Sequence, residues 1–498
     1  MSYALLLSVF IISTCGLVYE LIAGTLASYL LGDSVTQFST IIGVYLFSMG
    51  VGSFLSQYIN TGLISFFIQV ELLIGLVGGF STSILFLSFE YVSSFRILLY
   101  SLVSITGILV GIEIPILMRI LKSHFEFKDL VSKVFTFDYV GALIASLLFP
   151  LVLVPHLGLV RSSFMFGIIN VLVGIWTIYL FEKEVRWLKV MKGSAFLVLI
   201  SLILGFVFSE KIMSIAESIG YQDNVLYAKT SKYQRIVLTK SNTDLRLFLN
   251  GNLQFSSRDE YRYHEALVHF GLASLKNPKT ALVLGGGDGL AVREILKYPS
   301  IEKIILVDLD PAMTGLFSEN EFLLRLNQNS LLSEKVRVIN DDAFLWLKQN
   351  EMKFDFIAID FPDPSNFSVG KLYTDSFYRL IQKTLDQNGV GVIQSTSPYV
   401  AKKSFWCVDN TLKSVGFQTT PYHVFVPAFG DWGYILISRN TFRVPEEFPE
   451  GLLYINKDVA ATLTVFPGDM LQKINDVNRL NNQILVRYFE EEWSEYVH

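Results

Sequence analysis

The amino-acid sequence predicts a multispan α-helical membrane domain followed by a small β element and a Rossmann-like α/β domain. Two observations support this division. Of the 498 residues, 51% are hydrophobic and only 17% are charged, and the first 120 contain just seven Asp, Glu, Lys or Arg side chains. The second half instead has the composition of a soluble enzyme, and it alternates short apolar strands with amphipathic helices, which is the order of an open α/β sheet.

The first 210 residues are expected to form a transmembrane domain of six or seven helices. A span needs roughly 20 apolar residues to cross about 30 Å of hydrocarbon, and a seventh run, residues 194–208, is shorter than that. The N-terminus lacks the basic region and cleavage site of a signal peptide, so its first run is read as a retained span. The six long apolar runs cover residues 3–31, 38–59, 63–89, 95–120, 135–154 and 160–181.

Basic residues indicate how these spans are oriented. Lysines and arginines gather in residues 119–133 and 183–192, and the positive-inside tendency places both segments in the cytoplasm. With six spans the soluble half is cytoplasmic too, whereas with seven it is outside unless the seventh run is re-entrant or interfacial. We expect a multi-pass protein of the cell membrane with a cytoplasmic catalytic domain.

Four acidic residues fall within or at the ends of the apolar runs, where a charge is costly. They could form a cation-accepting path between helices, or they could be interfacial, neutral or paired for packing, and the second interpretation is favoured. These residues are Glu20, Glu71, Glu113 and Asp138.

Charge and cysteine content exclude some classes of function. The net charge is −5 and the soluble half has no basic arm or stripe, so nucleic acid is not expected as a partner. The two cysteines, Cys15 and Cys407, make neither a disulfide framework nor a zinc site.

The soluble half is expected to begin with a β-ribbon over residues 221–260, which turns at Asn250–Gly251. A Rossmann-like catalytic domain is expected over residues 261–445, and a C-terminal extension over 446–498. A helix follows the ribbon, and the antiparallel hairpin HVFVPAFGDWGYILISR closes the α/β pattern.

A glycine-rich loop follows the first buried strand of this domain. In TALVLGGGDGLAVREILK the glycines surround Asp288, and Asp308 ends the next strand, KIILV, where it can accept hydrogen bonds from ribose hydroxyls. Such a loop alone is weak evidence, because nucleotides, flavins and adenosyl sulfonium compounds all use it. A carboxylate in the loop suits a cationic or hydroxyl-bearing ligand better than a pyrophosphate.

Further acidic residues follow the later strands. Asp342 follows VRVIN and could accept a hydrogen bond from an adenine amine, while Asp360 and Asp363 follow FDFIAI and could hold a cation. Any one of these could simply cap a helix or a turn. Together with Asp288 and Asp308 they favour a ligand site, because open α/β sheets bind ligands at the carboxyl ends of their strands. The strand order is typical of an adenosylmethionine-dependent transferase.

Several segments resemble the spermidine synthases, which are polyamine aminopropyltransferases. The resemblance extends from about residue 233 to 438, and the multispan N-terminus and the C-terminal FPGDM…VNRLNNQILVRYFEEEW are similar to the membrane-bound branch of that family. The segments that carry it are YQRIVL, LFLNGNLQFSSRDEYRYHEALVH, VLGGGDGLAVREILKYPSIEKIILVDLDP and the D-x-x-D-P that begins at Asp360.

The resemblance implies transfer of an aminopropyl group from decarboxylated S-adenosylmethionine to putrescine or a related polyamine, giving spermidine and methylthioadenosine. It implies Asp360 as proton acceptor together with Tyr263, and Asp363 as the residue that grips the diamine. The donor is a co-substrate, no cofactor or metal is implied, and His264 is not read as a ligand. The implied donor-binding residues are Gln234, His264, Gly285, Gly287, Asp288, Asp308 and Asp342, and the implied polyamine-binding residues are Asp363, Tyr263, His264, Asp288, Gln394 and Trp432.

The sequence departs from the family pattern beside the paired aspartates. Phe361 and Pro362 stand between them, and Ser365–Asn366–Phe367 replaces the usual loop sequence, so the acceptor stays open. Relatives form dimers or larger homo-oligomers, which is the expectation here. The alternatives are a methyltransferase, or a polyamine transporter or sensor whose enzyme-like half is a binding module.

Overall fold

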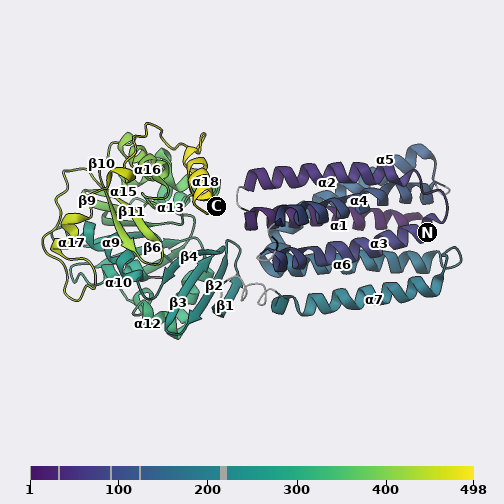
Figure 1. Ribbon diagram of the computed structural model, residues 1–498, viewed down its shortest axis with the longest axis horizontal. Coiled ribbons are helices and arrows are strands. Elements are labelled where there is room, and N and C mark those ends of the chain that lie inside the picture. Colours follow the sequence, from purple (N-terminus) through teal and green to yellow (C-terminus); the bar gives the residue numbers. More distant parts are fainter. Residues whose placement is uncertain are drawn as a thin grey trace. The chain divides into compact units, whose positions relative to one another are not determined.

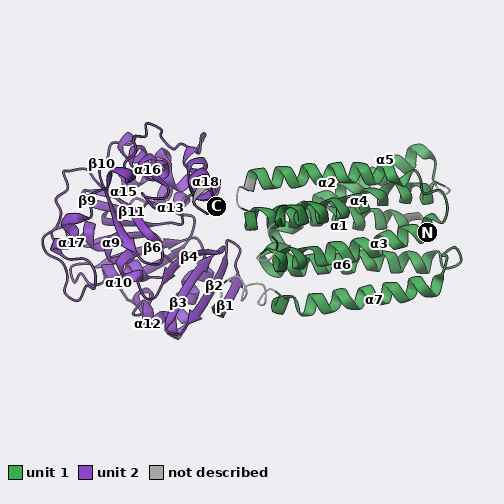
Figure 2. Ribbon diagram, in the orientation of Figure 1, with its two compact units in different colours: residues 1–225 green, residues 226–498 purple. Residues whose placement is uncertain are grey.

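The computed structural model describes residues 2–31, 34–89, 92, 94–122, 125–212, 221 and 223–497. The chain divides into two compact units, residues 1–225 and 226–498, drawn in different colours in Figure 2. The first unit is helical, and the second contains both β-sheets (Figure 1).

The helical unit contains long apolar helices joined by short connections. Its elements are α1 (Ser2–Leu31), α2 (Ser34–Ser56), α3 (Leu63–Ser88), α4 (Phe95–Leu121), α5 (Phe127–Leu148), the π-helical segment η1 (Phe149–Leu153), α6 (Val154–Leu180) and α7 (Leu188–Val207).

Six helices of the described residues are long and apolar enough to cross a membrane when Phe127–Leu180 is counted as one helix of 54 residues. A straight helix of that length would measure about 80 Å, far more than a bilayer core. Gly158 interrupts it with φ 70° and ψ 177°, which no α-helix adopts. The segment is therefore long enough for two crossings, which makes seven in total. The run expected at 194–208 is longer than the sequence suggested, because α7 begins at Leu188.

Close helix packing in this unit depends on small residues. A Cβ added at Gly52 of α2 would lie 2.0 Å from the carbonyl oxygen of Ile108, and one at Gly111 of α4 would lie 2.1 Å from that of Met49. Glycine at both positions lets the backbones of α2 and α4 approach each other, as in other helix pairs of membrane proteins.

Glu71 and Glu113 lie in the interior of the helical unit, with 0% and 1% of their surface exposed. Glu71 accepts a hydrogen bond from Asn170 Nδ2 at 3.0 Å, and the two carboxyl groups are within hydrogen-bonding reach of each other. This arrangement agrees with acids that are neutral or paired for packing.

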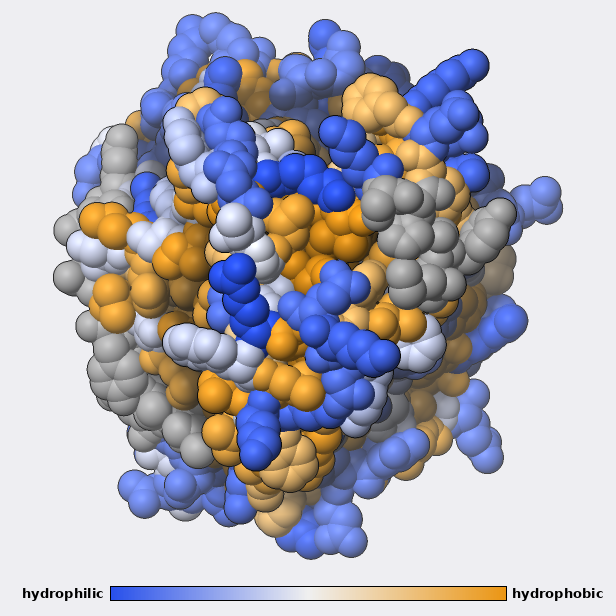
Figure 3. All heavy atoms as spheres, turned by 90° about the vertical axis from the view of Figure 1, so that its right-hand side faces the viewer, coloured by the Kyte–Doolittle hydropathy of each residue, from blue (hydrophilic) through white to orange (hydrophobic). Residues whose placement is uncertain are grey.

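Large apolar side chains cover the outside of the helical unit. Phe47 on α2, Leu143 on α5 and Leu197 on α7 are 74%, 58% and 69% exposed. Figure 3 shows one face of the molecule, on which apolar side chains occupy broad connected areas between polar ones. An apolar surface of this extent requires an apolar environment to cover it.

The second unit begins with a four-stranded sheet in the order β1-β2-β3-β4. The predicted turn forms at Asn250–Gly251, where both residues have positive φ (50° and 83°), as a tight two-residue hairpin requires. The strands are β1 (Asn224–Thr230), β2 (Arg235–Ser241), β3 (Asp244–Leu249) and β4 (Asn252–Ser256).

The larger sheet has seven strands in the order β10-β11-β9-β8-β5-β6-β7. Strands β5 to β9 are parallel, and β11 and β10 add an antiparallel edge. The strands are β5 (Thr280–Gly285), β6 (Lys303–Asp308), β7 (Val336–Asn340), β8 (Phe354–Asp360), β9 (Leu385–Gln394), β10 (Gln418–Val426) and β11 (Gly430–Ser438). The strand order reverses between β5 and β8, the position at which open α/β sheets bind ligands.

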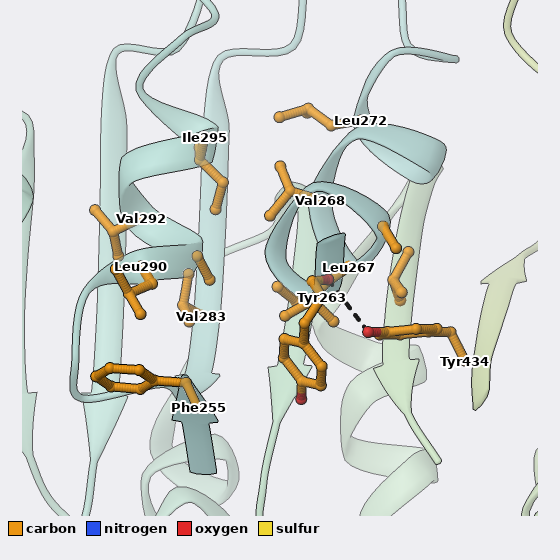
Figure 4. Packing of buried hydrophobic residues seen from close by; sticks show 14 of the residues in the cluster. Phe255, Tyr263, Leu267, Val268, Leu272, Val283, Leu290, Val292, Ile295 and Tyr434 are labelled. Atoms are coloured by element: carbon orange, nitrogen blue, oxygen red, sulfur yellow. Dashed lines mark hydrogen bonds between the residues drawn. The ribbon is translucent and has the colours of Figure 1, made fainter. Parts of the chain in front are cut away.

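Helices cover both faces of this sheet, and their apolar side chains form the core on each face. Part of one face is drawn in Figure 4, where α9 packs against the strands. The helices are α9 (Glu260–Leu272), α10 (Leu290–Ile295), α11 (Pro311–Glu319), α12 (Glu321–Leu326), η2 (Ser330–Leu332), α13 (Ala343–Gln349), α14 (Phe367–Gly370), η3 (Lys371–Tyr373), α15 (Asp375–Thr384), α16 (Lys402–Ser414), α17 (Lys457–Thr462), η4 (Gly468–Met470) and α18 (Ile484–Val497).

Candidate active site

The candidate site lies where β5 and β8 end side by side. Gly285 pairs with Asp360 in the parallel ladder, and a Cβ at Gly285 would lie 2.2 Å from the carbonyl oxygen of Asp360. Gly285 and Gly286 have φ of 79° and 62°, a left-handed conformation that favours glycine. The glycine loop can therefore turn directly beside Asp360.

Asp360 is the last residue of β8 and is partly buried. The Tyr263 hydroxyl donates a hydrogen bond to its Oδ1 at 2.5 Å. Tyr263 belongs to α9, and its carbonyl oxygen accepts a hydrogen bond from the Tyr434 hydroxyl at 3.2 Å, the dashed line in Figure 4. The tyrosine hydroxyl is thus held in place at the carboxylate that the sequence predicts as proton acceptor.

The surroundings of Asp360 raise its pKa to about 6, chiefly because burial disfavours the charged carboxylate and also because Asp288 is close. The positive charge of His264 and the hydrogen bond from Tyr263 act in the opposite direction. A carboxyl group with a pKa near 6 is a better proton acceptor than an ordinary aspartate, yet it is still mostly ionised at pH 7.

A buried ion-pair network supports this side of the site. His264 Nδ1 lies 2.8 Å from Glu260 Oε2, and Arg293 binds both oxygens of Glu260 at 2.8 and 2.9 Å. Burial opposes protonation of His264, but its bond with Glu260 and the nearby Asp288 and Asp360 raise its pKa to about 9. His264 is therefore charged at neutral pH and faces Asp288 and Asp360.

Asp363 lies three residues after Asp360, directly after Pro362, and has its own partners. Its Oδ1 accepts from Gln394 Nε2 at 3.3 Å, and its Oδ2 accepts from Thr396 Oγ1 at 3.2 Å. Burial raises the pKa of Asp363 to about 6, and these two donors oppose the rise. Trp432 Nε1 donates to Gln394 Oε1 at 3.1 Å, which fixes the orientation of the amide.

The predicted donor-side residues gather around the ends of β5 and β6. Asp308 Oδ2 accepts from the Gly287 amide at 3.1 Å, and burial raises the Asp308 pKa to about 6. Burial likewise raises the pKa of Asp288, whose Oδ1 accepts from the Leu290 amide at 2.9 Å. The Gln234 side-chain amide donates to Asp310 Oδ2 at 3.0 Å.

Asp342 is placed differently from the other acids. Its Oδ1 accepts from the Phe344 amide and caps α13, and its Oδ2 forms an ion pair with Lys371 at 2.6 Å. Burial would raise its pKa, but Lys371 and the helix amides lower it overall. Both oxygens therefore already have partners within the protein, as the helix-cap interpretation of this residue anticipated.

The structure adds residues that the sequence did not single out. Asp310 could have been noticed, since it follows Asp308 in the quoted VDLDP segment. Thr396 offers no sequence signal, but its φ of 54° is rare for a β-branched residue and often marks a functional site.

Glu260 and Arg293 form the network with His264, and Trp493 of α18 donates to Thr396 Oγ1 at 3.4 Å.

Asp360 and Asp363 differ in their contacts from the other acids at this edge. Among the described residues, neither Asp360 nor Asp363 forms an ion pair with a lysine, arginine or histidine. Both carboxylates are therefore available to a cationic ligand. Fold and site together define the second unit as a Rossmann-like transferase domain with an acidic site.

Comparison with known proteins identifies the family. Residues 260–446 match the spermine/spermidine synthase domain. Polyamine aminopropyltransferase of Leptospira interrogans (serogroup Icterohaemorrhagiae serovar copenhageni) is 53% identical over 494 residues, which cover 99% of each chain. Polyamine aminopropyltransferase 2 of Ralstonia nicotianae is 51% identical over 98% of each chain. A crystal structure of a spermidine synthase with the transition-state analogue AdoDATO is 27% identical, with a TM-score of 0.46, covering 49% of this chain and 86% of that one.

The chain belongs to the polyamine aminopropyltransferases. Its reaction is transfer of an aminopropyl group from decarboxylated S-adenosylmethionine to a polyamine acceptor, with the donor consumed as a substrate. The predicted family, fold class and enzyme activity are confirmed. Across the part of the chain that the structure describes, no cluster of three or more His, Cys, Asp or Glu is arranged to hold a metal ion.

The raised pKa values predict the pH dependence of turnover. In the roles that the sequence predicts for them, Asp360 and Asp363 act only when ionised, and each takes up a proton as the pH falls through about 6. At saturating donor concentration, a plot of the logarithm of kcat/KM for the acceptor against pH should therefore have a slope that is steeper by two below that pH. A pH–rate profile from pH 4.5 to 9 measures this. If the break comes near pH 4 instead, the carboxyl groups have ordinary pKa values and the assignment is wrong.

Proposed function

We propose that Asp360 is the proton acceptor of aminopropyl transfer and that Asp363 holds the far end of the acceptor as an ammonium group. The observation that carries this proposal is the pair of partly buried carboxylates without cationic partners among the described residues, one of them bonded to Tyr263. A diamine is a dication at neutral pH, because amine pKa values are near that of lysine, about 10. One end must stay charged for binding while the other loses a proton for attack.

The proposed step follows from this arrangement. The neutral amine attacks the methylene carbon of the aminopropyl group that is bonded to the sulfonium sulfur. A carbon–nitrogen bond forms and the carbon–sulfur bond breaks, and its electron pair goes to sulfur to give neutral methylthioadenosine. Asp360 Oδ2 accepts the proton that the attacking nitrogen loses, since Oδ1 is bonded to the Tyr263 hydroxyl.

The donor is proposed to lie along the glycine loop, where Gly285, Gly287, Asp288 and Asp308 meet. Asp308 is at the end of β6, the usual position for binding ribose hydroxyls. Gln234 would act together with Asp310, to which it is bonded. Asp342 would bind the adenine amine only through lone pairs that Lys371 and the helix amides leave free.

Mass spectrometry tests the reaction and identifies the acceptor. The full chain in detergent is incubated with either decarboxylated or intact S-adenosylmethionine and with putrescine or a longer polyamine. We expect methylthioadenosine together with an acceptor that is heavier by one aminopropyl group. Methylated product from the intact donor would support a methyltransferase instead.

Asp363→Asn tests the acceptor-binding role. Removing one partner of a desolvated charge pair costs about 2 kcal/mol or more, so KM for the acceptor should rise at least about 30-fold, while the dissociation constant of the donor stays unchanged. Asp386→Asn is the matched control, because Asp386 lies at the opposite end of β9 and, within the described part of the chain, its side chain bonds the Asn388 amide and no residue of the site. A KM for Asp363→Asn equal to that of the control would contradict the role.

We also propose that the helical unit is embedded in a lipid bilayer, with the catalytic unit in the cytoplasm. The length and exposed apolar surface of the helices support the first statement. The second rests on the donor, a permanent sulfonium cation that does not cross a bilayer unaided. A cytoplasmic catalytic unit agrees with cytoplasmic basic segments only if the number of membrane crossings is even. If α5, α6 and α7 each cross the bilayer, that number is odd.

Labelling of single introduced cysteines in intact cells decides the sidedness. One cysteine replaces exposed Lys128 in the first turn of α5, and the other replaces partly exposed Lys402 in the catalytic unit. A Lys402→Cys thiol that reacts with an impermeant reagent would place the catalytic unit outside. A Lys128→Cys thiol that alone reacts would give an odd number of crossings and a cytoplasmic enzyme.

The assembly is proposed to be a homodimer or larger, which mass photometry of the detergent-purified chain measures.

A further inference from the structure

The C-terminal helix α18 reaches the acceptor side of the site. Trp493 Nε1 donates a hydrogen bond to Thr396 Oγ1 at 3.4 Å, and Thr396 Oγ1 lies 3.2 Å from Asp363 Oδ2. Because an indole nitrogen can only donate, the Thr396 hydroxyl accepts from Trp493 and turns its own hydrogen toward Asp363. Trp493 is therefore two hydrogen bonds away from the carboxylate that is proposed to grip the acceptor.

The residue before Trp493 fixes the position of the helix. Glu492 accepts hydrogen bonds from the Lys403 and Ser404 amides at 2.7 and 3.0 Å, and from Ser404 Oγ at 2.8 Å. These amides belong to the first turn of α16, where a carboxylate is stabilised by unpaired N–H groups and by the helix dipole. Trp493 is consequently held in register with Thr396 by its neighbour in the sequence.

The same helix also packs against the segment that follows Asp363. A Cβ at Gly370 would lie 2.5 Å from Val486 Cγ2 and 2.6 Å from Gln483 Oε1. Leu485 and Val486 are buried, with 0% and 3% of their surface exposed. The short helix α14, which replaces the loop sequence typical of soluble relatives, thus rests directly on the first turn of α18.

We propose that α18 forms a wall of the acceptor subsite and that Trp493 is a positioning residue that helps to select the acceptor by its length. The inference rests on the proposed role of Asp363. An ammonium group bound to Asp363 would lie close to the indole ring, which attracts cations electrostatically. The Trp493–Thr396 hydrogen bonds also favour the ionised form of Asp363, because Thr396 opposes the effect of burial on its pKa.

Steady-state kinetics of the full chain in detergent tests the proposal. The acceptors are diaminopropane, putrescine and cadaverine, which differ by one methylene group each, and the donor is decarboxylated S-adenosylmethionine. Trp493→Ala should raise KM for the preferred acceptor about tenfold, as expected for loss of a cation–π contact and a hydrogen bond. It should also shift the order of kcat/KM among the three acceptors, while KM for the donor and kcat stay within about twofold.

Trp406→Phe is the matched control, since Trp406 is also a partly buried tryptophan, bonded through Nε1 to the Met470 carbonyl oxygen, and it has no bond to Asp363 or Thr396. If Trp493→Ala does not fold, Trp493→Phe decides instead: it keeps a ring and loses the N–H group, and it should raise acceptor KM about threefold.

Two results would overturn the proposal. One is an acceptor KM and an acceptor order equal to those of the parent chain. The other is a parallel loss in donor KM, acceptor KM and kcat, which would mean a structural role only. If the parent chain itself transfers no aminopropyl group, the proposed roles of Asp360 and Asp363 fail, and that result is distinct from either of these.

Discussion

Asp360→Asn should lower kcat by about 10²–10⁴-fold, the range typical of a lost general base, and should leave the dissociation constant of the donor within a few-fold of the parent value. The amide has nearly the same shape as the carboxylate, so the Tyr263 hydroxyl, now 2.5 Å from Oδ1, can still find an oxygen there. What is lost is the ability to accept the proton of the attacking amine. Stopped-flow turnover and calorimetric titration with the donor measure the two quantities separately.

Tyr263→Phe is the companion variant. It removes a hydrogen bond that opposes the raised pKa of Asp360 but leaves the carboxylate in place. It should reduce kcat far less than Asp360→Asn and should move the acidic break of the pH profile upward. Near-normal turnover by Asp360→Asn would contradict the assignment of the base. A larger loss in Tyr263→Phe than in Asp360→Asn would make the tyrosine the more important group.

Arg293→Met should destabilise the catalytic unit by about 3–5 kcal/mol, the cost of leaving a buried charge without its partner. Arg293 is 8% exposed, binds Glu260 through two parallel hydrogen bonds and also binds Glu294 at 2.8 Å. Methionine fills part of the volume but provides no hydrogen-bond donor. Unfolding of the full chain in detergent, followed by tryptophan fluorescence in increasing urea, measures the loss.

Arg379→Met provides the control for the same substitution at an exposed ion pair. Arg379 is 3.9 Å from Asp375, and its side chain is 58% exposed. Such pairs contribute about 0–1 kcal/mol. If Arg293→Met is no less stable than Arg379→Met, the buried network does not stabilise the fold. The only remaining role of the network would then be to keep His264 charged.

The sequence was sufficient to predict the sheet and the edge at which the acids gather. Strands of a parallel sheet are buried on both faces, so they appear in the sequence as short apolar runs. Asp308 and Asp360 end such runs, and Asp288 follows one after the glycines of the loop. The hydrogen-bond partners of side chains do not follow from such local patterns. The bonds of Gln234 to Asp310 and of Asp342 to Lys371 could not be predicted, because they depend on how separate segments pack.

The sequence also anticipated the break at Gly158, which falls between the apolar runs at residues 135–154 and 160–181. One further contact could not be predicted. Trp493 meets Thr396 across 97 residues of sequence, and the cap formed by Glu492 on α16 helps to place it there. Local patterns identify strands and turns, whereas the placement of a terminal helix depends on tertiary contacts.

The three carboxyl groups with raised pKa values also affect stability, with the opposite sign to their effect on turnover. Asp308, Asp360 and Asp363 have pKa values of about 6 in the folded chain, above the model-peptide value of about 3.9. The folded state therefore holds protons that the unfolded state has released, and stability falls as the pH rises from about 4 to 6. These three groups therefore favour the folded state of the empty enzyme in mildly acidic buffer, where the enzyme is least active. Cationic substrates offset this loss at neutral pH, so a thermal-shift screen at pH 7 would detect acceptors by how far each raises Tm.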